Sequence, residues 1–464
     1  MKRIHKKVSA VLAAVVLFVS CDEQLEIAPI GFLSDENTFE TVDNLQQGLN
    51  AAYTGMTSEL NLQFDIMTDE VKPGADNGGQ YINFYNFNLN AQSGESSAHW
   101  TSNYGMINSV NRVLQGAESV EVAAEDQAEF NNILGQLYAL RAFGHFQLLT
   151  WFSTDYTDDS SLAVPYVDFV VTIEELPRNT VGEVVAGINA DIAQARTFLS
   201  ETNGNIIMNQ DALTAMEARM NLYLENFDVA LTKAQELIDA YPLANRGEYE
   251  GIFADSDNTE VILKARRVAG NFPVGAYYYF TGSAGPFLEM SNGLYDALDP
   301  ADIRYDVNFW EDSSDPDNNS HLIGKYTGPG FLNDLKIFRV SEMYLIKAEA
   351  QARTNDLEGA GETIKEIRDA RFGVDTPAPV YSSVNDALTG ILDERRIELA
   401  FEGHRYLDIR RLRDVLNIGI TRDARDCPTG NCDLPAADYR FNLPIPLAEL
   451  NANENMVQNP GYGS

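Results

Sequence analysis

Cysteines and histidines are the residues of this 464-residue chain that could most readily bind a metal or form a covalent link. Cys427 and Cys432 enclose the turn-forming sequence Pro-Thr-Gly-Asn, so a short loop can bring the two thiols together. A zinc site would need further ligands. The histidines beyond the first twenty residues form no metal-ligand spacing with each other or with this loop; they are His99, His145, His321 and His404. The pattern therefore favours a small structural disulfide, which forms in proteins that leave the cytoplasm.

The N-terminus has the pattern of a secretory signal. Residues 1–7 are basic, and residues 8–20 form an apolar run that is too short to span a bilayer as a helix. The run ends in Leu-Phe-Val-Ser followed by Cys21, which resembles a bacterial lipobox. An ordinary signal peptide followed by an unrelated cysteine is the alternative. We expect a signal peptide over 1–20 and a lipid on Cys21, which anchors the protein to a membrane without spanning it.

An extended tether is expected over residues 21–33. Its first side chains after the cysteine, Asp22 and Glu23, resemble the acidic export signal of surface lipoproteins in Bacteroidetes. A lipid-anchored protein with this signal would belong to the outer membrane and face the cell surface.

The chain is strongly acidic. It has 69 Asp and Glu against 33 Lys and Arg, a formal charge of −36. Four of the basic residues lie in the signal peptide, so the mature chain is more acidic still. Because nucleic-acid binding requires patches of Lys and Arg, this charge argues against a nucleic-acid partner.

Motifs that identify catalytic sites are missing from the sequence. It contains no G-x-S-x-G nucleophile elbow, phosphate loop, dinucleotide-binding glycine pattern or H-E-x-x-H. Carboxylate pairs for glycoside hydrolysis cannot be recognised, because their separations are invisible in a sequence. The acidic segment 312–319 resembles half a calcium loop, but it lacks the required Gly and bidentate Glu. We therefore expect no enzyme activity, no cofactor and no metal.

Helical patterns dominate both flanks of the chain. One begins near Ser34, a suitable N-cap that acidic residues follow. Apolar periodicity predicts further helices at about 100–117, 125–151, 180–199, 211–224, 227–241, 340–353, 357–371, 384–402 and 405–416. The helical scaffold should therefore cover about 34–71, 101–241 and 339–417 of a single domain over 34–464.

Two helix pairs share a spacing of small residues. Ala218 and Ala230 lie twelve residues apart across a turn, and so do Ala348 and Ala360. Alanines at such positions let two antiparallel helices approach closely, which is typical of tetratricopeptide hairpins. Any αα-hairpin would show part of this pattern, but we favour a tetratricopeptide-like scaffold.

The amino-acid composition changes at about 72–100 and 242–338. Gly, Pro, Asn and Asp are frequent there, and aromatic residues cluster among them. Long irregular connections in a compact protein usually carry function. These two stretches should therefore form a loop-rich ligand lobe on the helical scaffold.

Residues 393–411, which read Asp-Glu-Arg-Arg-Ile-Glu-Leu-Ala-Phe-Glu-Gly-His-Arg-Tyr-Leu-Asp-Ile-Arg-Arg, resemble the signature segment of the SusD/RagB family of Bacteroidetes outer-membrane lipoproteins. Further resemblances follow in the order of the family: Phe39 with Ala51-Ala52-Tyr53, Leu140-Arg141-Ala142-Phe143, Val164-Pro165, Asn442-Leu443-Pro444-Ile445-Pro446 and Gln458-Asn459-Pro460-Gly461-Tyr462.

The signature itself should hold the fold together and not contact a ligand. Opposite charges stand three residues apart, so a helix could neutralise itself along one face. These pairs are Arg395–Glu398, Glu402–Arg405, Arg405–Asp408 and Asp408–Arg411. Gly403 interrupts the helical pattern and allows a bend or a close approach.

The resemblance implies a mostly α, SusD-like fold and a protein that captures glycan for a SusC-like TonB-dependent outer-membrane transporter. A peptide-binding, RagB-like subunit is the alternative, and a lipoprotein scaffold without a ligand is another. The acidic charge would repel a polyanion, so we expect a neutral oligosaccharide.

Aromatic rings that stack on sugars and amides that bind hydroxyls are the expected binding residues. Trp310 is the preferred aromatic, because it lies in the irregular acidic segment. Trp151 lies late in an apolar helix and is expected in the core. The remaining candidates are Trp100, Tyr81, Tyr85, Tyr295, Tyr278 and Asn103, with Asn83 and Asn292 at lower rank.

Overall fold

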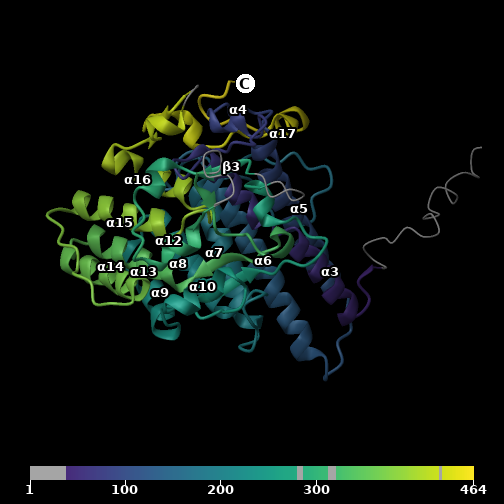
Figure 1. Cartoon of the computed structure of the whole chain (residues 1–464). Helices are drawn as coiled ribbons and strands as arrows, with labels where there is room; N and C mark the ends of the chain where they lie inside the picture. Colours follow the sequence, from purple (N-terminus) through teal and green to yellow (C-terminus); the bar gives the residue numbers. More distant parts are fainter. Residues whose placement is uncertain (1–37, 280–285, 312–319, 428–430, 464) are drawn as a thin grey trace, which may run out of the picture.

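The fold is built mainly from helices, which Figure 1 shows on both sides of the molecule and through its middle. The computed structural model describes residues 38–279, 286–311, 320–427 and 431–463. The predicted signal peptide, Cys21, the tether and the acidic segment 312–319 lie outside these residues.

The long helices agree closely with the periodicity of the sequence. In the first half they are α3 (Val42–Thr54), α5 (Gly94–Ala117), α6 (Gln127–Phe152), α7 (Val181–Phe198), α8 (Gln210–Tyr223) and α9 (Phe227–Ala240). In the second half they are α13 (Val340–Arg353), α14 (Leu357–Phe372), α15 (Val384–Glu398) and α16 (Arg405–Leu416). Shorter helices are α4 (Ile82–Tyr85), α10 (Arg246–Phe253), α11 (Asn292–Tyr295), α12 (Ile303–Asn308) and α17 (Leu447–Ala452), and a 3-10 helix, η1, covers Ser58–Met67.

Capping side chains fix where several helices begin. Thr180 and Glu183 form a reciprocal capping box at the start of α7, which satisfies two backbone N–H groups that have no partner within the helix. Asn209 caps α8 and Ser383 caps α15 more simply: one side-chain oxygen accepts a hydrogen bond from a backbone N–H of the first turn. The helix boundaries therefore follow from local sequence as well as from packing.

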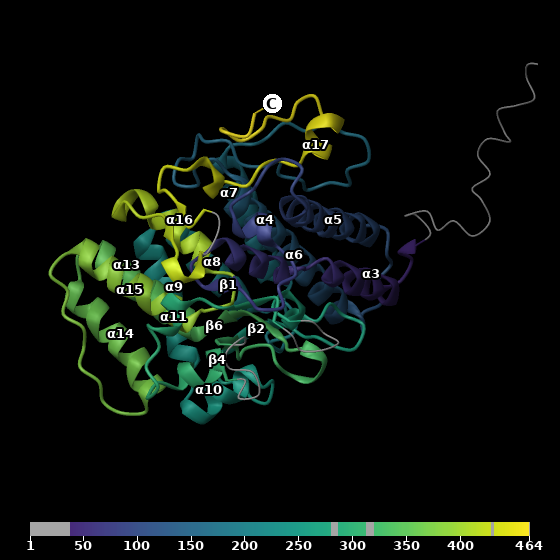
Figure 2. The same ribbon diagram turned by 45° about the horizontal axis from the view of Figure 1, so that its top comes forward.

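Helical hairpins form the scaffold. Helix α8 packs against α9 and α13 against α14, and α9 and α15 both contact α13. Ala218, Ala230, Ala348 and Ala360 are fully buried, as expected for small residues at close helix–helix contacts. Figures 1 and 2 show α13, α14 and α15 side by side, away from α3 and α5. The paired helices thus stack into a rigid body.

The loop-rich lobe contains short antiparallel strands in two-stranded sheets. Strand β1 (Val71–Pro73) pairs with β3 (Leu288–Met290), and β2 (Val261–Ala265) pairs with β6 (Leu335–Arg339). Strand β4 (Phe309–Trp310) pairs with β5 (Leu322–Ile323), and β7 (Ile420–Thr421) pairs with β8 (Asp433–Leu434). The first two sheets join segments that lie far apart in the sequence, so they fasten distant stretches to each other, whereas β4 and β5 are close in sequence.

A continuous apolar core connects the scaffold to the lobe. Trp151 on α6 is completely buried and stacks on Phe64, with ring centroids 4.1 Å apart. Tyr406 on α16 lies 5.6 Å from the same indole.

Within the described residues, no helix combines the length and the hydropathy that a membrane span needs.

The signature segment does hold the fold together, but not through the expected local pairs. Helix α15 ends at Glu398, four residues earlier than predicted, and Phe401 and Gly403 adopt positive φ before α16 begins. Of the four ion pairs expected within the segment, which is described in full, the structure forms Asp408–Arg411 at 2.9 Å and not the other three.

The remaining charges reach other parts of the chain. Arg405 binds Asp69 through two hydrogen bonds of 2.8 and 2.9 Å, and Glu402 binds Arg339 and Lys325 at 2.8 Å each. These side chains are buried, so each charge needs its partner to offset the cost of leaving water. The expectation of local pairing was therefore wrong for three of the four pairs, because the fold supplies oppositely charged partners from distant elements.

Candidate functional site

The hairpin of β4 and β5 presents aromatic side chains on two opposite faces. Successive residues of a strand point to opposite sides, so Phe309 and Trp310 point apart. Trp310 faces Leu322 across the ladder, and Phe309 faces Ile323. This alternation divides the aromatic residues that the sequence placed together into two groups.

On one face, Trp310 stands on a rigid base. Its side chain is 45% exposed, and its ring centroid lies 6.5 Å from that of Tyr279. Tyr279 is buried, stacks nearly parallel on Phe331 at 5.5 Å and donates a 2.6 Å hydrogen bond to the carbonyl oxygen of Ile323. An indole that is fixed in this way offers solvent a flat apolar surface at little entropic cost.

On the other face lies a group that we call the tyrosine cluster: Tyr295, Tyr305, Phe309 and His321. The ring of Tyr295 stacks on His321 with centroids 3.9 Å apart, and it meets Phe309 edge-on at 5.0 Å. The hydroxyls of Tyr295 and Tyr305 lie 3.2 Å apart. The cluster therefore combines ring surfaces with groups that can donate and accept hydrogen bonds.

Polar side chains surround the tyrosine cluster. Lys72 on β1 donates a 3.0 Å hydrogen bond to the hydroxyl of Ser320, lies 3.4 Å from Nδ1 of His321 and pairs with Glu289 at 3.6 Å. Burial and the nearby Lys72 lower the pKa of His321 to about 4, so its ring is neutral at neutral pH.

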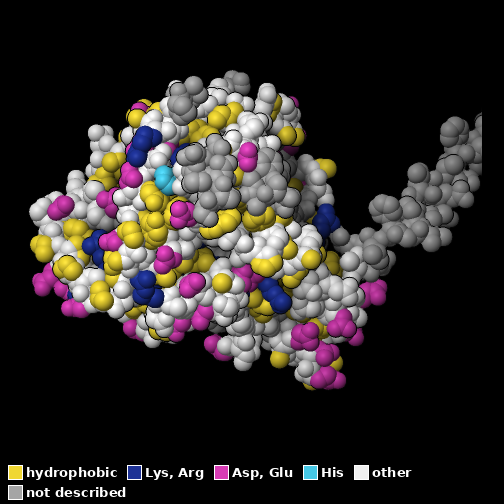
Figure 3. Space-filling view, viewed as in Figure 1, with side chains coloured by type: hydrophobic (Ala, Val, Ile, Leu, Met, Phe, Trp, Pro, Cys, Tyr) yellow, Lys and Arg dark blue, Asp and Glu magenta, His cyan; other side chains and the backbone are white. Residues whose placement is uncertain are grey.

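The phenol of Tyr305 is also neutral at neutral pH. The hydrogen bond between the hydroxyls of Tyr305 and Tyr295 raises the pKa of Tyr305 to about 12, with burial as a further cause. A neutral phenol and a neutral imidazole suit hydroxyl-rich ligands better than charged ones. In the space-filling view of Figure 3, hydrophobic side chains are exposed across the middle of the face, and acidic side chains gather along the lower margin.

Several predicted binding residues are packing residues instead. Tyr278 is fully buried, and Tyr85 is buried with its hydroxyl donating to the carbonyl oxygen of Asp426 at 2.9 Å. Neither ring can stack on a ligand in this conformation, because the core already covers both. Tyr81 is half-buried against the core and adopts a left-handed backbone conformation at the start of α4. Of the two lower-ranked amides, Asn83 is exposed and Asn292 is hydrogen-bonded within the fold.

Trp100 and Asn103 belong to the interior of α5. Trp100 is only 3% exposed and packs edge-on against Phe152 at 4.9 Å. The amide of Asn103 is buried and donates to the backbone carbonyl of His99 at 2.8 Å. Both side chains are therefore mostly packed within the fold, and the prediction that they bind ligand stays a prediction.

A pocket of about 340 Å³ does open above Trp100. Its walls are mainly apolar, and Trp100 contributes to them. Residues that line it include Trp100, Tyr104, Val171, Leu176 and Glu449. None of the residues that line this pocket belongs to the aromatic groups of the β4–β5 hairpin.

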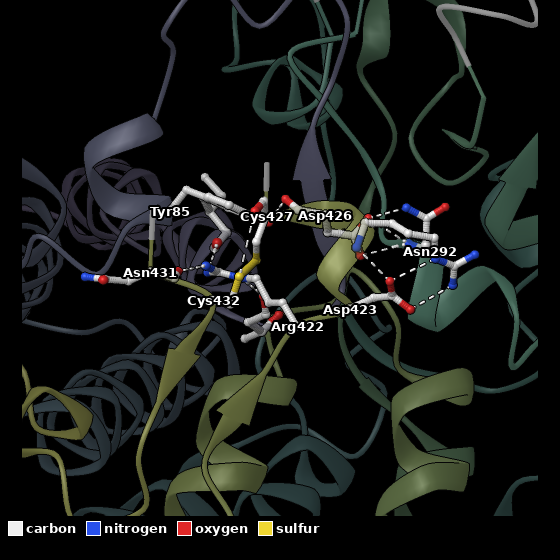
Figure 4. Close-up of a disulfide and its surroundings, with 11 residues drawn as sticks. Tyr85, Asn292, Arg422, Asp423, Asp426, Cys427, Asn431 and Cys432 are labelled. Atoms are coloured by element: carbon white, nitrogen blue, oxygen red, sulfur yellow. Dashed lines mark hydrogen bonds and ion pairs between the residues drawn. A yellow bond between two sulfur atoms is a disulfide. The ribbon is translucent and has the colours of Figure 1, made fainter. Parts of the chain in front are cut away.

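Cys427 and Cys432 form a disulfide in the structure, with Cα atoms 5.6 Å apart (Figure 4). It closes a loop between β7 and β8, far in sequence from the aromatic residues. No cluster of three or more His, Cys, Asp or Glu side chains within the described residues is arranged to hold a metal ion.

The sequence reasoning missed Tyr305, His321 and Lys72 as site residues. Tyr305 stood in the aromatic-rich stretch and could have been ranked with its neighbours. In the sequence, His321 stands out only as a possible metal ligand, and no motif marks Lys72. Their proximity depends on the β1–β3 and β4–β5 pairings, which local sequence does not reveal.

The architecture points to a class of proteins: in fold, the chain is similar to solved structures of the SusD superfamily. A SusD superfamily protein from Bacteroides thetaiotaomicron has a TM-score of 0.78 and 23% sequence identity, with 90% of this chain and 100% of that chain covered. A structure described as a laminarin-binding SusD-like protein has a TM-score of 0.70 and 20% identity, with 91% and 100% covered.

Sequence comparison places the chain within that class. Residues 323–462 match the family described as "SusD family", and residues 31–223 match the family described as "Starch-binding associating with outer membrane". The SusD-like protein P2 of Formosa agariphila is 27% identical, over 97% of this chain and 98% of its own. The starch-binding protein SusD of Bacteroides thetaiotaomicron is 29% identical over 28% of this chain and 22% of its own. This chain belongs to the SusD/RagB family.

Proposed function

We propose that this protein is an outer-membrane lipoprotein that captures a neutral oligosaccharide at the β4–β5 hairpin and delivers it to a SusC-like TonB-dependent transporter. The observation that carries the proposal is the exposed, rigidly supported indole of Trp310. The family supports carbohydrate as the ligand, since its members include the starch-binding and laminarin-binding proteins named above.

The chemistry of the hairpin suits a sugar. The apolar face of a pyranose ring can stack on Trp310, while hydroxyls at its edge need hydrogen-bond partners. Leaving one hydroxyl buried without a partner costs about 1–3 kcal/mol. The opposite face of the hairpin offers a second ring surface, where the phenols of Tyr295 and Tyr305 can serve as partners for a sugar bound on that face.

Local charges favour a neutral ligand. The ammonium group of Lys72 is already paired with Glu289, and Arg304 is buried in ion pairs with Asp302 and Glu394. Arg304 therefore cannot join Arg266, an exposed residue, in a basic patch for an anionic glycan. With the acidic charge of the whole chain, a polyanion would be repelled over about one Debye length, ~8 Å at physiological salt.

Membrane attachment and delivery rest on other parts of the chain. The lipobox-like sequence before Cys21 supports a lipid anchor, and the matched family description associates its members with the outer membrane. The transporter is proposed as the partner because membership of the family supports it. We infer no chemical step, because the proposed role is capture and transfer.

Binding of named glycans tests the proposal. Protein that lacks the signal peptide is titrated with laminarin, soluble starch and a peptide digest, and a glycan array extends the search. Trp310→Ala should lower the affinity for the bound glycan at least tenfold. Phe169→Ala is the matched control, since Phe169 is equally exposed at 43% on another part of the surface.

The alternatives predict different results. Binding of peptides without any glycan would favour the RagB-like function, and binding of neither would favour a scaffold without a ligand. Equal glycan affinity in the wild type and in Trp310→Ala would remove the hairpin as the site. Co-purification of the full-length lipoprotein with an outer-membrane β-barrel transporter from detergent-solubilised cells would test delivery.

A further inference from the structure

Helix α11, which carries Tyr295, is held at both ends by the loop that the disulfide closes. We call this the disulfide loop, meaning the described residues 422–427 and 431–432 between β7 and β8. At the start of α11, the carboxylate of Asp426 accepts hydrogen bonds from the backbone N–H of Asn292, at 3.0 and 3.2 Å, and from its side-chain amide. Just after its end, Asp296 pairs with Arg425. Figure 4 shows Asp426 and Asn292 pointing toward each other beside the disulfide.

The disulfide loop is itself firmly seated. The guanidinium of Arg422 stacks over the ring of Tyr85, 3.7 Å from its centroid. It also donates to the carbonyl oxygens of Thr68 at 2.9 Å, of Ile66 at 3.2 Å and of Asn431 at 3.3 Å. With the disulfide on one side and η1 on the other, the loop has few ways to move, so it can serve as a fixed support.

Helix α11 depends on outside support because it is a single turn of four residues. One turn has too few internal hydrogen bonds to offset the entropy of forming it. Ser291 caps the turn by accepting from the N–H of Leu294 at 3.1 Å, and its own hydroxyl donates to the carbonyl oxygen of Asp69 at 2.6 Å. The buried side chain of Leu294 and the contacts to Asp426 and Arg425 supply further fixed points.

The ring of Tyr295 points from the last position of this turn into the tyrosine cluster. It stacks on His321, and its hydroxyl meets that of Tyr305. A rotation or fraying of α11 would displace the ring, because the ring moves with the backbone of this turn. The orientation of the tyrosine cluster is therefore linked to a loop that does not itself belong to the cluster.

We propose that the disulfide loop positions Tyr295 for binding, with Asp426 and Arg425 as positioning residues and the Cys427–Cys432 bond as the element that keeps the loop in place. The loop would then act on ligand affinity through α11 alone. The part of this inference that concerns ligand affinity rests on the proposed function, whereas the mechanical link does not.

Hydrogen–deuterium exchange of the mature chain tests the mechanical link without a ligand. Asp426→Ala and the double variant Cys427→Ala/Cys432→Ala should raise the exchange rate of peptides covering 288–297 at least tenfold and leave α13 unchanged. Asp438→Ala is the matched control, since Asp438 pairs with Arg440 in the same C-terminal region at 2.6 Å. Should either variant unfold as a whole, Arg425→Ala replaces it, because Arg425 is half exposed. Unchanged exchange over 288–297 would overturn the proposal.

A double-mutant cycle tests the effect on binding, with laminarin and soluble starch as probes in affinity electrophoresis. If Asp426 acts through Tyr295, Asp426→Ala should weaken binding about fivefold in the wild type and should have no further effect in Tyr295→Ala. Additive losses would contradict the proposed route. If neither polysaccharide retards the wild type, the proposed ligands fail, while the exchange result still decides whether the loop holds α11.

Discussion

Arg371 and Glu398 are both completely buried, and two hydrogen bonds of 2.9 and 3.0 Å join their side chains. Arg371 comes from α14 and Glu398 is the last residue of α15, so the pair fastens neighbouring scaffold helices. Glu398 also binds Arg339 at 3.1 Å and Arg304 at 3.3 Å. One carboxylate from the signature segment thus connects the scaffold to the ends of β6 and α12, two elements of the lobe.

Removing the charge of Glu398 should therefore destabilise the protein strongly. The surrounding guanidinium groups hold the pKa of Glu398 well below its usual range. Glu398→Gln would leave buried cations without their partner, and breaking a buried ion pair in this way costs about 3–5 kcal/mol. Urea denaturation followed by circular dichroism measures the loss of unfolding free energy.

The exposed residue Glu358 on α14 provides the control for this change. Glu358→Gln should alter the unfolding free energy by less than about 0.5 kcal/mol, as surface substitutions usually do. An equally small effect of Glu398→Gln would show that the network adds little to stability.

The sequence was a good guide to the helices because their signals are local. Apolar periodicity located α13 over residues 340–353, in agreement with the structure. It failed where long-range partners decide the outcome. Glu398, Glu402 and Arg405 have suitable charges three residues away, but each binds a side chain from another element. Helical periodicity also continued through Phe401, where the positive φ depends on tertiary contacts.

The candidate site was harder to predict than the fold. The irregular texture located the lobe, and the exposed indole of Trp310 lies within it. Composition could not separate Tyr278, which is buried, from Tyr295, which stands in the tyrosine cluster. That distinction depends on which strand pairs with which, and strand partners such as β1 and β3 are more than two hundred residues apart.

Truncation of Trp100 should mainly lower the unfolding free energy, whereas truncation of Trp310 should mainly lower the affinity for glycan. Trp100 is buried in α5, so Trp100→Ala leaves a cavity and should cost about 3–5 kcal/mol of unfolding free energy. Trp310 lies half in solvent, so Trp310→Ala should cost about 1 kcal/mol or less while it lowers glycan affinity. Chemical denaturation of both variants makes the comparison. A larger stability loss for Trp310→Ala would contradict the division into packing and binding roles.

Stability should depend on pH through Glu70. Burial, with a smaller effect of Asp69, raises the pKa of Glu70 to about 8, although Arg405 and Arg396 oppose the shift. The folded state therefore holds a proton that the unfolded chain releases above about 4.5. Stability from this group is present at low pH and is lost as the pH rises toward 8, by about 1.4 kcal/mol per unit.

Glu70→Gln should remove this dependence, since an amide does not ionise in this range. The amide oxygen can still accept the 3.3 Å hydrogen bond from the N–H of Phe401. Unfolding free energies of the wild type and the variant, measured at pH 5, 6.5 and 8, should diverge with rising pH in favour of the variant. Parallel curves would mean that Glu70 ionises alike in both states.

Gly403 should tolerate no side chain, for two separable reasons. Its φ is +80°, a conformation that costs other residues about 1–2 kcal/mol. A Cβ atom there would also lie 2.8 Å from Cβ and 3.0 Å from the backbone carbon of Asn61, so the chain would have to move.

Gly79 has a similar φ of +90° but nothing within 4 Å of the corresponding position. Gly79→Ala therefore measures the backbone cost alone, about 1–2 kcal/mol. Gly403→Ala should cost at least about 2 kcal/mol more, since overpacking adds about 1–3 kcal/mol. Urea denaturation of the two variants separates these contributions, and equal losses would show that the turn between α15 and α16 yields without resistance from η1.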